Sequence, residues 1–246
     1  FVTCNVANEQ LITNEAGVAT SKEYPLGEYI VQEADAGEWY HLNDEKRNVK
    51  ISEDGEIVML DFKNKSKQPR VNITKSCKNS VKSNEEIKYE FEIMNSGEVS
   101  LENFTWYDIL PSKQAKITKI STGTYNQELS YNICYKTNYK DTYMIAKANL
   151  NTTQNNYIDL TQIHLEEGEK ITEIKINFGT VKVGFCNIEK PHIYMQVNSD
   201  LENDTKIKNH TILEGFAQDY KVSDEDTATS TIYNVIEKKK LPRTGF

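Results

Sequence analysis

The stretch IKYEFEIMNSGEVSLENFTWYDILP, residues 87–111, decides the fold class. Its first part alternates Ile87, Tyr89 and Phe91 with charged residues, which is the period of a strand with one buried face. NSGE then signals a turn, and FTWYDIL follows as an apolar run of strand length. The stretch therefore predicts two strands joined by a turn.

The same pattern extends outward along the chain. IVQEA, NVKIS, EIVMLDF, KITEIKINF and HIYMQVN have strand length and composition, and turn signals such as NEAG, PLG, EDG, EEGE and NSD separate them. Helical periodicity does not persist beyond two turns anywhere. We therefore predict an all-β protein of two tandem β-sandwich domains, joined near the polar, proline-containing residues 66–70, with a flexible C-terminal tail.

Composition and charge limit which partners the chain can bind and whether it can span a membrane. The chain has 246 residues, 37% of them apolar, and a net charge of −8, which argues against a nucleic-acid partner. Apolar runs fall short of the length that spans a membrane, and we expect no signal peptide in the residues given. Because Phe1 is not a start residue, we expect a fragment that is trimmed at both ends.

Motifs for catalysis and metal binding are missing from the sequence. The cysteines are too scattered for a zinc site, and we interpret them as half-buried thiols, although one or two disulfides of unknown pairing remain open: Cys4, Cys77, Cys134 and Cys186. The four histidines do not pair with a Ser or Cys motif, and a glycine-rich phosphate loop is lacking. The acidic run 224–226 reads as a solvated turn. We therefore expect neither an enzyme nor a cofactor or metal.

Residues 1–66 resemble a known surface module. GVATS is followed by YPLGEY, by Glu33 in YIVQEA, and by a closing segment that ends at Asn64. This order resembles the prealbumin-like, Cna B-type or SpaA-like pilin domain of Gram-positive surface proteins, with the usual Leu-Pro inverted at Pro25-Leu26. The resemblance implies a β-sandwich in this part of the chain.

Many members of that family form a covalent lysine–asparagine bond. The resemblance implies that Glu33 is the acid and Asn64 the acceptor, whereas residues 1–8 contain no lysine. We therefore expect no bond at Asn64 in this fragment. The alternative, that Glu33 is a surface carboxylate and Asn64 forms a turn at a strand end, stays open.

Residues 71–236 resemble a second module. VNITKSCKNS, the 87–111 stretch with its Asp-x-Leu-Pro ending, INFGTVKVGFCNIEKPHIYMQVNSD and the last strands are similar to the Ig-like repeat related to Cna A-type pilin domains. Residues 121–160 fit less well and suggest insertions. The resemblance implies Lys75 as amine, Asp108 as acid and Asn209 as acceptor, with Asn234 as the alternative. In the competing interpretation Asp108 only ends a strand and Lys75 is solvated.

Residues 237–246 form a tail with a sorting motif. It consists of Leu241, Pro242, Arg243, Thr244 and Gly245, behind a lysine run that we interpret as a solvated linker. Leu-Pro-x-Thr-Gly is the recognition sequence of sortases. The implied chemistry is acyl transfer: a sortase thiolate attacks the Thr244 carbonyl, Gly245 leaves, and a peptidoglycan cross-bridge amine takes its place.

These observations predict a secreted, wall-anchored structural protein that acts as a stalk or pilin-like subunit. Because a Tyr-Pro-Lys-type pilin motif is missing, we favour an anchored monomer or an accessory subunit. The alternative is an adhesin whose second domain binds a host or matrix ligand. That reading requires exposed, contiguous aromatic side chains within residues 121–160, which contain Tyr125, Tyr131, Tyr135, Tyr139 and Tyr143.

Overall fold

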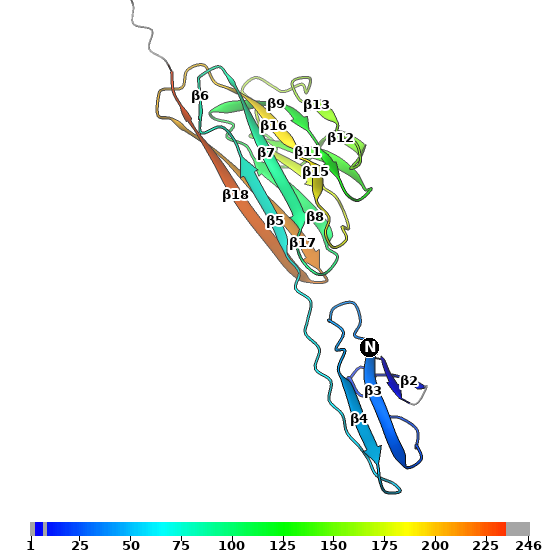
Figure 1. Cartoon of the computed structure of the whole chain (residues 1–246). Coiled ribbons are helices and arrows are strands. Elements are labelled where there is room, and N and C mark those ends of the chain that lie inside the picture. The colour runs from blue at the N-terminus through cyan, green and yellow to red at the C-terminus, as the bar shows by residue number, and fades with distance from the viewer. Residues whose placement is uncertain (1–2, 7–8, 235–246) are drawn as a thin grey trace, which may run out of the picture. The chain divides into compact units, whose positions relative to one another are not determined.

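The computed structural model describes residues 3–6 and 9–234, and the chain divides into two units, Phe1–Gln68 and Pro69–Phe246 (Figure 1). The described residues form strands, turns and loops but no helix, so the all-β prediction is confirmed. In that part of the chain, consequently, no helix has the length and apolarity to cross a membrane. The expected tail, residues 237–246, lies outside the described residues.

The first unit contains one four-stranded antiparallel sheet in the order β2-β1-β3-β4. Its strands are β1 (Thr3–Val6), β2 (Glu9–Ile12), β3 (Gly27–Asp35) and β4 (Lys46–Ile51). Where the structure describes side-chain burial in this unit, from residue 9 on, few side chains are buried: Val31 and Glu33 on β3, and Ala36 just after it. Alternate residues of β3 thus face a small interior.

The prediction of a strand over residues 56–62, EIVMLDF, was wrong. Ile57 and Met59 are 88% and 90% exposed, and the segment pairs with no strand among the described residues. An apolar run of strand length becomes a strand only where another strand offers its backbone donors and acceptors. The segment that follows residues 56–62 does have a backbone partner: the Lys67 amide donates to the Trp39 carbonyl at 2.8 Å.

The second unit is a sandwich of two sheets, with strand orders β12-β11-β14-β8-β17-β18-β6 and β13-β9-β16-β7-β5. The strands of the larger sheet are β6 (Ser80–Val81), β8 (Glu102–Ile109), β11 (Ser130–Thr137), β12 (Met144–Asn151), β14 (Ile171–Asn177), β17 (Lys206–Ala217) and β18 (Tyr220–Ile232). Those of the smaller sheet are β5 (Val71–Ser76), β7 (Glu86–Asn95), β9 (Ala115–Ser121), β13 (Tyr157–Asp159) and β16 (His192–Val197). A short pair, β10 (Thr124–Tyr125) and β15 (Asn187–Glu189), completes the unit.

The core lies between these two sheets. On β7, Tyr89 and Phe91 face inward, in agreement with the alternation seen in the sequence. Trp106, on β8 of the opposite sheet, meets Phe91 with ring centroids 4.6 Å apart. Asn95 closes the predicted turn because its amide donates to the Val99 carbonyl and accepts from the Gly97 amide. The stretch 87–111 therefore contributes one strand to each sheet.

Carboxylates join the two sheets where β5 lies beside β18 (Figure 1). Asp224 accepts a hydrogen bond from the Ile73 amide at 2.9 Å, and Asp226 accepts one from the Lys75 amide at 2.7 Å. The acidic run is therefore part of β18, and its interpretation as a solvated turn was wrong. β5 is an edge strand, so on the side that faces β18 its backbone amides have no neighbouring strand to donate to. The carboxylates of Asp224 and Asp226 accept the hydrogen bonds of these amides instead.

Candidate functional site: a buried lysine, aspartate and asparagine

Three polar side chains from three strands enter the core of the second unit. Lys75 follows Val71 and Ile73 on the inward face of β5, and Asn209 takes an inward position between Ile207 and Thr211 on β17. Asp108 lies on β8 and is 0% exposed. Because side chains alternate between the two faces of a strand, these three polar residues occupy core positions that are usually apolar.

Lys75 and Asp108 form a buried ion pair. Lys75 Nζ donates to Asp108 Oδ2 at 2.6 Å, and both side chains are 0% exposed. The ammonium lies 5.2 Å from the ring centroid of Tyr89 and 4.9 Å from that of Phe91. Lys75 is therefore not a solvated strand lysine, and Asp108 does more than end a strand. Its second oxygen, Oδ1, has no hydrogen-bond partner among the described residues.

Asn209 lies next to this pair. In the β8–β17 register Asp108 is opposite Thr211, two residues from Asn209 and on the same face, which is a diagonal cross-strand contact. The Asn209 amide is close enough to lower the pKa of Asp108. Neither of its polar atoms, however, forms a hydrogen bond of normal geometry, although the side chain is fully buried. Each such unpaired group costs about 1–3 kcal/mol in a folded protein.

Burial moves the two pKa values of the pair toward each other. Desolvation lowers the pKa of Lys75, opposed by the negative charge of Asp108. Desolvation also raises the pKa of Asp108, opposed by the charge and the hydrogen bond of Lys75. Both shifts favour transfer of one proton from the ammonium to the carboxylate, because a neutral pair loses less hydration than an ionic one. A neutral lysine amine is a nucleophile, whereas an ammonium is not.

Asn234, the alternative acceptor, lies elsewhere and is fully hydrogen-bonded. Its Oδ1 accepts from the Ser83 amide at 3.0 Å, and its Nδ2 donates to the Leu201 carbonyl at 3.0 Å. It follows Asp226, whose carboxylate accepts from the Lys75 amide, by eight residues of extended chain, or roughly 25 Å. The geometry therefore favours Asn209 as the partner of Lys75.

The first unit contains a similar acid–amide pair. Glu33 is 3% exposed and is therefore not a surface carboxylate. Its Oε1 accepts from Asn64 Nδ2 at 2.6 Å, and its Oε2 accepts from the Asn43 amide at 2.7 Å. Asn64 Oδ1 is buried and has no partner among the described residues. Within the same residues, no lysine forms an ion pair with Glu33.

The tyrosines of residues 121–160 do not form the exposed aromatic surface that the adhesin alternative requires. Tyr125, Tyr131 and Tyr135 are buried, and the ring of Tyr125 stacks on Phe185 at 5.1 Å. Tyr139 and Tyr157 are 55% and 72% exposed, and Tyr143 is half-buried. The segment is built into the sandwich as strands β10 to β13, and three of its six tyrosines fill the core.

Sequence reasoning missed the residues that support the buried pair. Asp226 holds the backbone of Lys75, and Tyr89 and Phe91 wall off its ammonium. Trp106 Nε1 donates to the Thr211 hydroxyl at 2.8 Å, which fixes the strand beside Asn209. The alternation of buried residues along β7 predicted that Tyr89 and Phe91 face the core. No local sequence signal, however, identifies Asp226 as the hydrogen-bond partner of Lys75, which lies 151 residues away in the chain.

The remaining predictions for individual residues have mixed outcomes. Leu241 to Gly245 lie outside the described residues. Cys77, Cys134 and Cys186 have free, partly buried thiols. A group of three or more His, Cys, Asp or Glu side chains suited to a metal ion does not occur in the described part of the chain.

Solved structures that are similar to this chain include two major pilins of low sequence identity. The curated proteins include no match. BcpA, the major pilin subunit of Bacillus cereus, is 13% identical with a TM-score of 0.34, covering 94% of this chain and 63% of BcpA. The major pilin SpaD from Corynebacterium diphtheriae is 16% identical with a TM-score of 0.36, covering 90% of this chain and 51% of SpaD. This chain thus spans about half to two thirds of the length of these pilins.

A match to a protein family is confined to the first unit. Residues 2–66 match the family described as SpaA, prealbumin-like fold domain. The region agrees with the resemblance inferred for residues 1–66, whereas no comparison tests the one inferred for residues 71–236. Residues 2–66 are therefore similar to the SpaA prealbumin-like domain.

Proposed function

We propose that the chain is a structural piece of a Gram-positive surface protein, a stalk or pilin-like subunit, whose second unit closes a covalent bond between Lys75 and Asn209. The observation that carries this proposal is the buried trio: an amine paired with an acid at 2.6 Å, beside an amide whose polar atoms have no partner. A buried side-chain amide without hydrogen bonds destabilises the folded protein. Cross-linking would remove the unpaired NH₂ group of Asn209 and turn its carbonyl into part of a new amide.

The reaction is an amide exchange. Asp108 takes a proton from the Lys75 ammonium, and the neutral Nζ forms a bond to Cγ of Asn209. The protonated Asp108 stabilises the developing charge on Oδ1 and passes its proton to Nδ2, so that the Cγ–Nδ2 bond breaks. Nζ gives up its second surplus proton to the departing ammonia, which leaves as ammonium. The product is a secondary amide, and the chain becomes lighter by the mass of one ammonia. Asp108 is regenerated, and no oxidant or cofactor is consumed.

The trio has the features that such a reaction requires. The aromatic rings of Tyr89 and Phe91 exclude water from the amine, which favours its neutral form. The strands hold the groups in place before reaction, which lowers the entropy cost of bringing them together. In the first unit, Glu33 and Asn64 provide an acid and an amide, but no lysine forms an ion pair with Glu33 within the described residues, so we propose no bond there.

Mass spectrometry tests the cross-link. The intact chain should weigh one ammonia less than its sequence requires, and peptide mapping should recover Lys75 and Asn209 in one branched peptide. Asp108→Ala should restore the full mass, whereas Glu33→Ala, a matched change in the first unit, should leave the deficit in place. A full mass for the unaltered chain, or a deficit that maps to Asn64 or Asn234, would refute the proposal.

Attachment to the cell wall is the second part of the proposal. The motif from Leu241 to Gly245 would be cut between Thr244 and Gly245, and a peptidoglycan amine would receive the Thr244 carbonyl, which makes the protein secreted and wall-bound. Incubation of the chain, extended by a few residues, with a sortase and a glycine nucleophile should yield the transfer product. Product that still forms from Thr244→Ala would show that the motif is not the substrate.

A further inference from the structure

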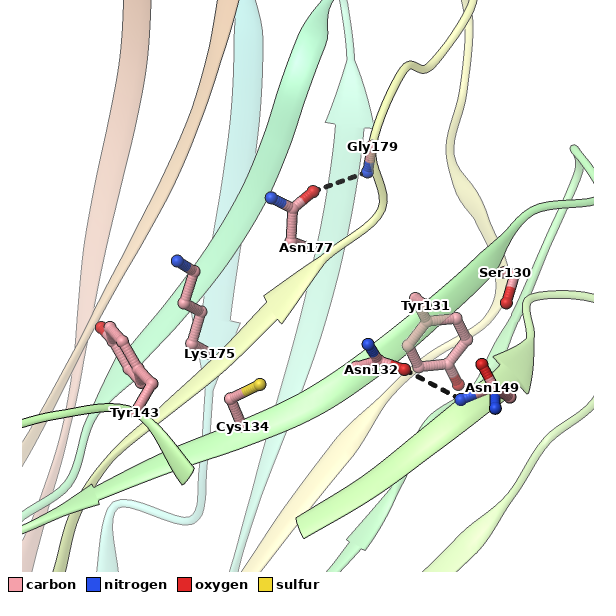
Figure 2. A pocket seen from close by; sticks show the side chains of 9 residues that line it. All are labelled: Ser130, Tyr131, Asn132, Cys134, Tyr143, Asn149, Lys175, Asn177 and Gly179. Atoms are coloured by element: carbon pink, nitrogen blue, oxygen red, sulfur yellow. Dashed lines mark hydrogen bonds between the residues drawn. The ribbon is translucent and has the colours of Figure 1, made fainter. Parts of the chain in front are cut away.

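A groove lies against the larger sheet of the second unit, and Figure 2 shows the side chains that line it. Its volume is about 390 Å³, and strands β11, β12 and β14 contribute most of its lining. Small-molecule sites usually have volumes of about 300–1,000 Å³, so the groove lies at the small end of that range. The residues that decide its chemistry are Ser130, Asn132, Cys134, Asn149, Lys175 and Asn177.

Strand pairing arranges these residues in successive rows. In the β11–β14 register Cys134 is opposite Lys175, and Asn132 is opposite Asn177. Their neighbours Ile133 and Ile176 face the core, so the paired side chains face outward. Ser130 continues the series by two more residues. The groove thus carries a cation, then two amides, then a hydroxyl, over roughly 13 Å.

Hydrogen bonds fix the direction of both amides. Asn132 Oδ1 accepts from the Asn149 amide at 2.8 Å, and Asn177 Oδ1 accepts from the Gly179 amide at 2.7 Å (Figure 2). Because a backbone N–H can bond only to the oxygen, each side chain must leave its NH₂ group free. Neither NH₂ has a partner among the described residues. Both therefore remain available as donors to a ligand.

The charge of the groove is positive. Lys175 contacts the rings of Tyr143 and Tyr107, at 4.8 and 5.6 Å from their centroids, and forms no ion pair within the described residues. Carboxylates are missing from the groove lining. The adjacent acid on this face of β14, Glu173, accepts instead from the Tyr143 hydroxyl. In a chain of net charge −8, an unpaired ammonium beside two free NH₂ groups selects an anion.

We propose that this groove binds an acidic sugar, with its carboxylate at Lys175 and its hydroxyls along Asn132, Asn177 and Ser130. The Lys175 ammonium accounts for the carboxylate, and the free NH₂ groups of Asn132 and Asn177 account for the hydroxyls next to it. At the other end, the Ser130 hydroxyl and the Asn149 side-chain amide each offer both a donor and an acceptor, which suits sugar hydroxyls. A peptide that joins a sheet uses its edge, whereas this groove lies on a face, so a hydroxyl-rich ligand is favoured.

Binding is tested on the full chain by NMR titration with glucuronic acid. Saturable shifts should appear at β11 and β14, with a dissociation constant on the order of 1–10 mM that weakens as salt is added. Glucose, which has the same ring without the carboxylate, should bind at least roughly tenfold more weakly. Equal binding of glucose, equal binding of acetate or N-acetylglutamate, or shifts confined to other surfaces would each overturn the proposal.

Matched variants locate the contact. Lys175→Gln should weaken glucuronic acid binding roughly tenfold or more, because it removes a charge-assisted hydrogen bond. Asn132→Asp keeps the acceptor for Asn149 but replaces the NH₂ by a charged oxygen, and it should abolish binding. Lys136→Gln is the control, because Lys136 lies on the same face of β11, pairs with Asp141 and does not line the groove. Unchanged affinity in Lys175→Gln would refute the site, and the mass deficit tests the cross-link separately.

Discussion

In the first unit, Glu33 accepts hydrogen bonds from the Asn64 side chain and the Asn43 amide, and no lysine forms an ion pair with it within the described residues. In the second unit, Asp108 accepts from Lys75, and Asn209 lies beside Asp108. The surroundings differ as well. Two sheets enclose the second trio, whereas the first unit leaves Ile57 and Met59 almost fully exposed.

This difference separates two consequences of burying a carboxylate. Glu33 is satisfied by hydrogen bonds from neutral donors, so it holds a loop in place and needs no charge beside it. Asp108 is paired with a buried cation, so each group depends on the other for its place in the core. A buried acid alone therefore supports local structure, and only the added amine makes cross-linking chemistry available.

The largest effect is expected from Asp108→Ala. Loss of the cross-link should remove about 5 kcal/mol of stabilisation, because the bond closes the long loop from Lys75 to Asn209. The variant also leaves Lys75 buried without a partner, at a further cost of about 3–5 kcal/mol. Chemical denaturation should show both losses. The double variant Lys75→Met/Asp108→Ala should recover the second loss only, and equal stability of the two variants would contradict this division.

A smaller effect is expected from Glu33→Ala in the first unit. The change leaves the Asn43 amide and the Asn64 side chain without their acceptor, which should cost roughly 2–3 kcal/mol. Hydrogen exchange of the Asn43 amide should accelerate accordingly. Glu28→Ala, an exposed change on the same strand, is the control. If both variants exchange alike, Glu33 does not hold this loop.

Asp226→Ala tests how β5 is held next to β18. The substitution removes the acceptor of the Lys75 amide and should lower the free energy of unfolding by roughly 1–3 kcal/mol. It should also slow cross-link formation after refolding, followed by the mass deficit over time, because Lys75 is less well positioned. Glu225→Ala, whose side chain faces solvent on the same strand, should change neither quantity. Normal rates in both variants would show that Asp226 does not position Lys75.

The smallest effect concerns acid stability of the second unit. Hydrogen bonds from the Glu166 amide and the Thr137 hydroxyl hold the pKa of Glu169 below its ordinary value of 4.5. Stability from this group is therefore full above about pH 5 and declines as the pH falls through the lowered pKa. Glu169→Gln should flatten the stability profile below pH 4.5. Exposed Glu167→Gln should keep the profile of the unaltered chain, and a flat profile in that chain would exclude this role for Glu169.

The sequence predicted the elements whose signal is local. The alternation around Tyr89 and Phe91 indicated β7, and the resemblance brought Lys75, Asp108 and Asn209 together as candidates. Features that depend on partners distant in the sequence could not be predicted. Residues 56–62 have strand composition, but composition does not say whether a neighbouring strand exists. Asp226 and the Lys175 groove likewise depend on which strands pair, which no local pattern reveals.

The places of Lys75 and Asn209 along the chain have a consequence for tension. Lys75 lies on the first strand of the second unit, and Asn209 lies on the last strand but one. If the two are joined, a pull on the ends of this unit passes from β5 directly into β17, and the chain between them carries none of it. Without the bond, the same pull could draw out on the order of 450 Å of hidden length. One amide would thus keep this length from being drawn out, and only the chain beyond Asn209, which includes β18, would still extend.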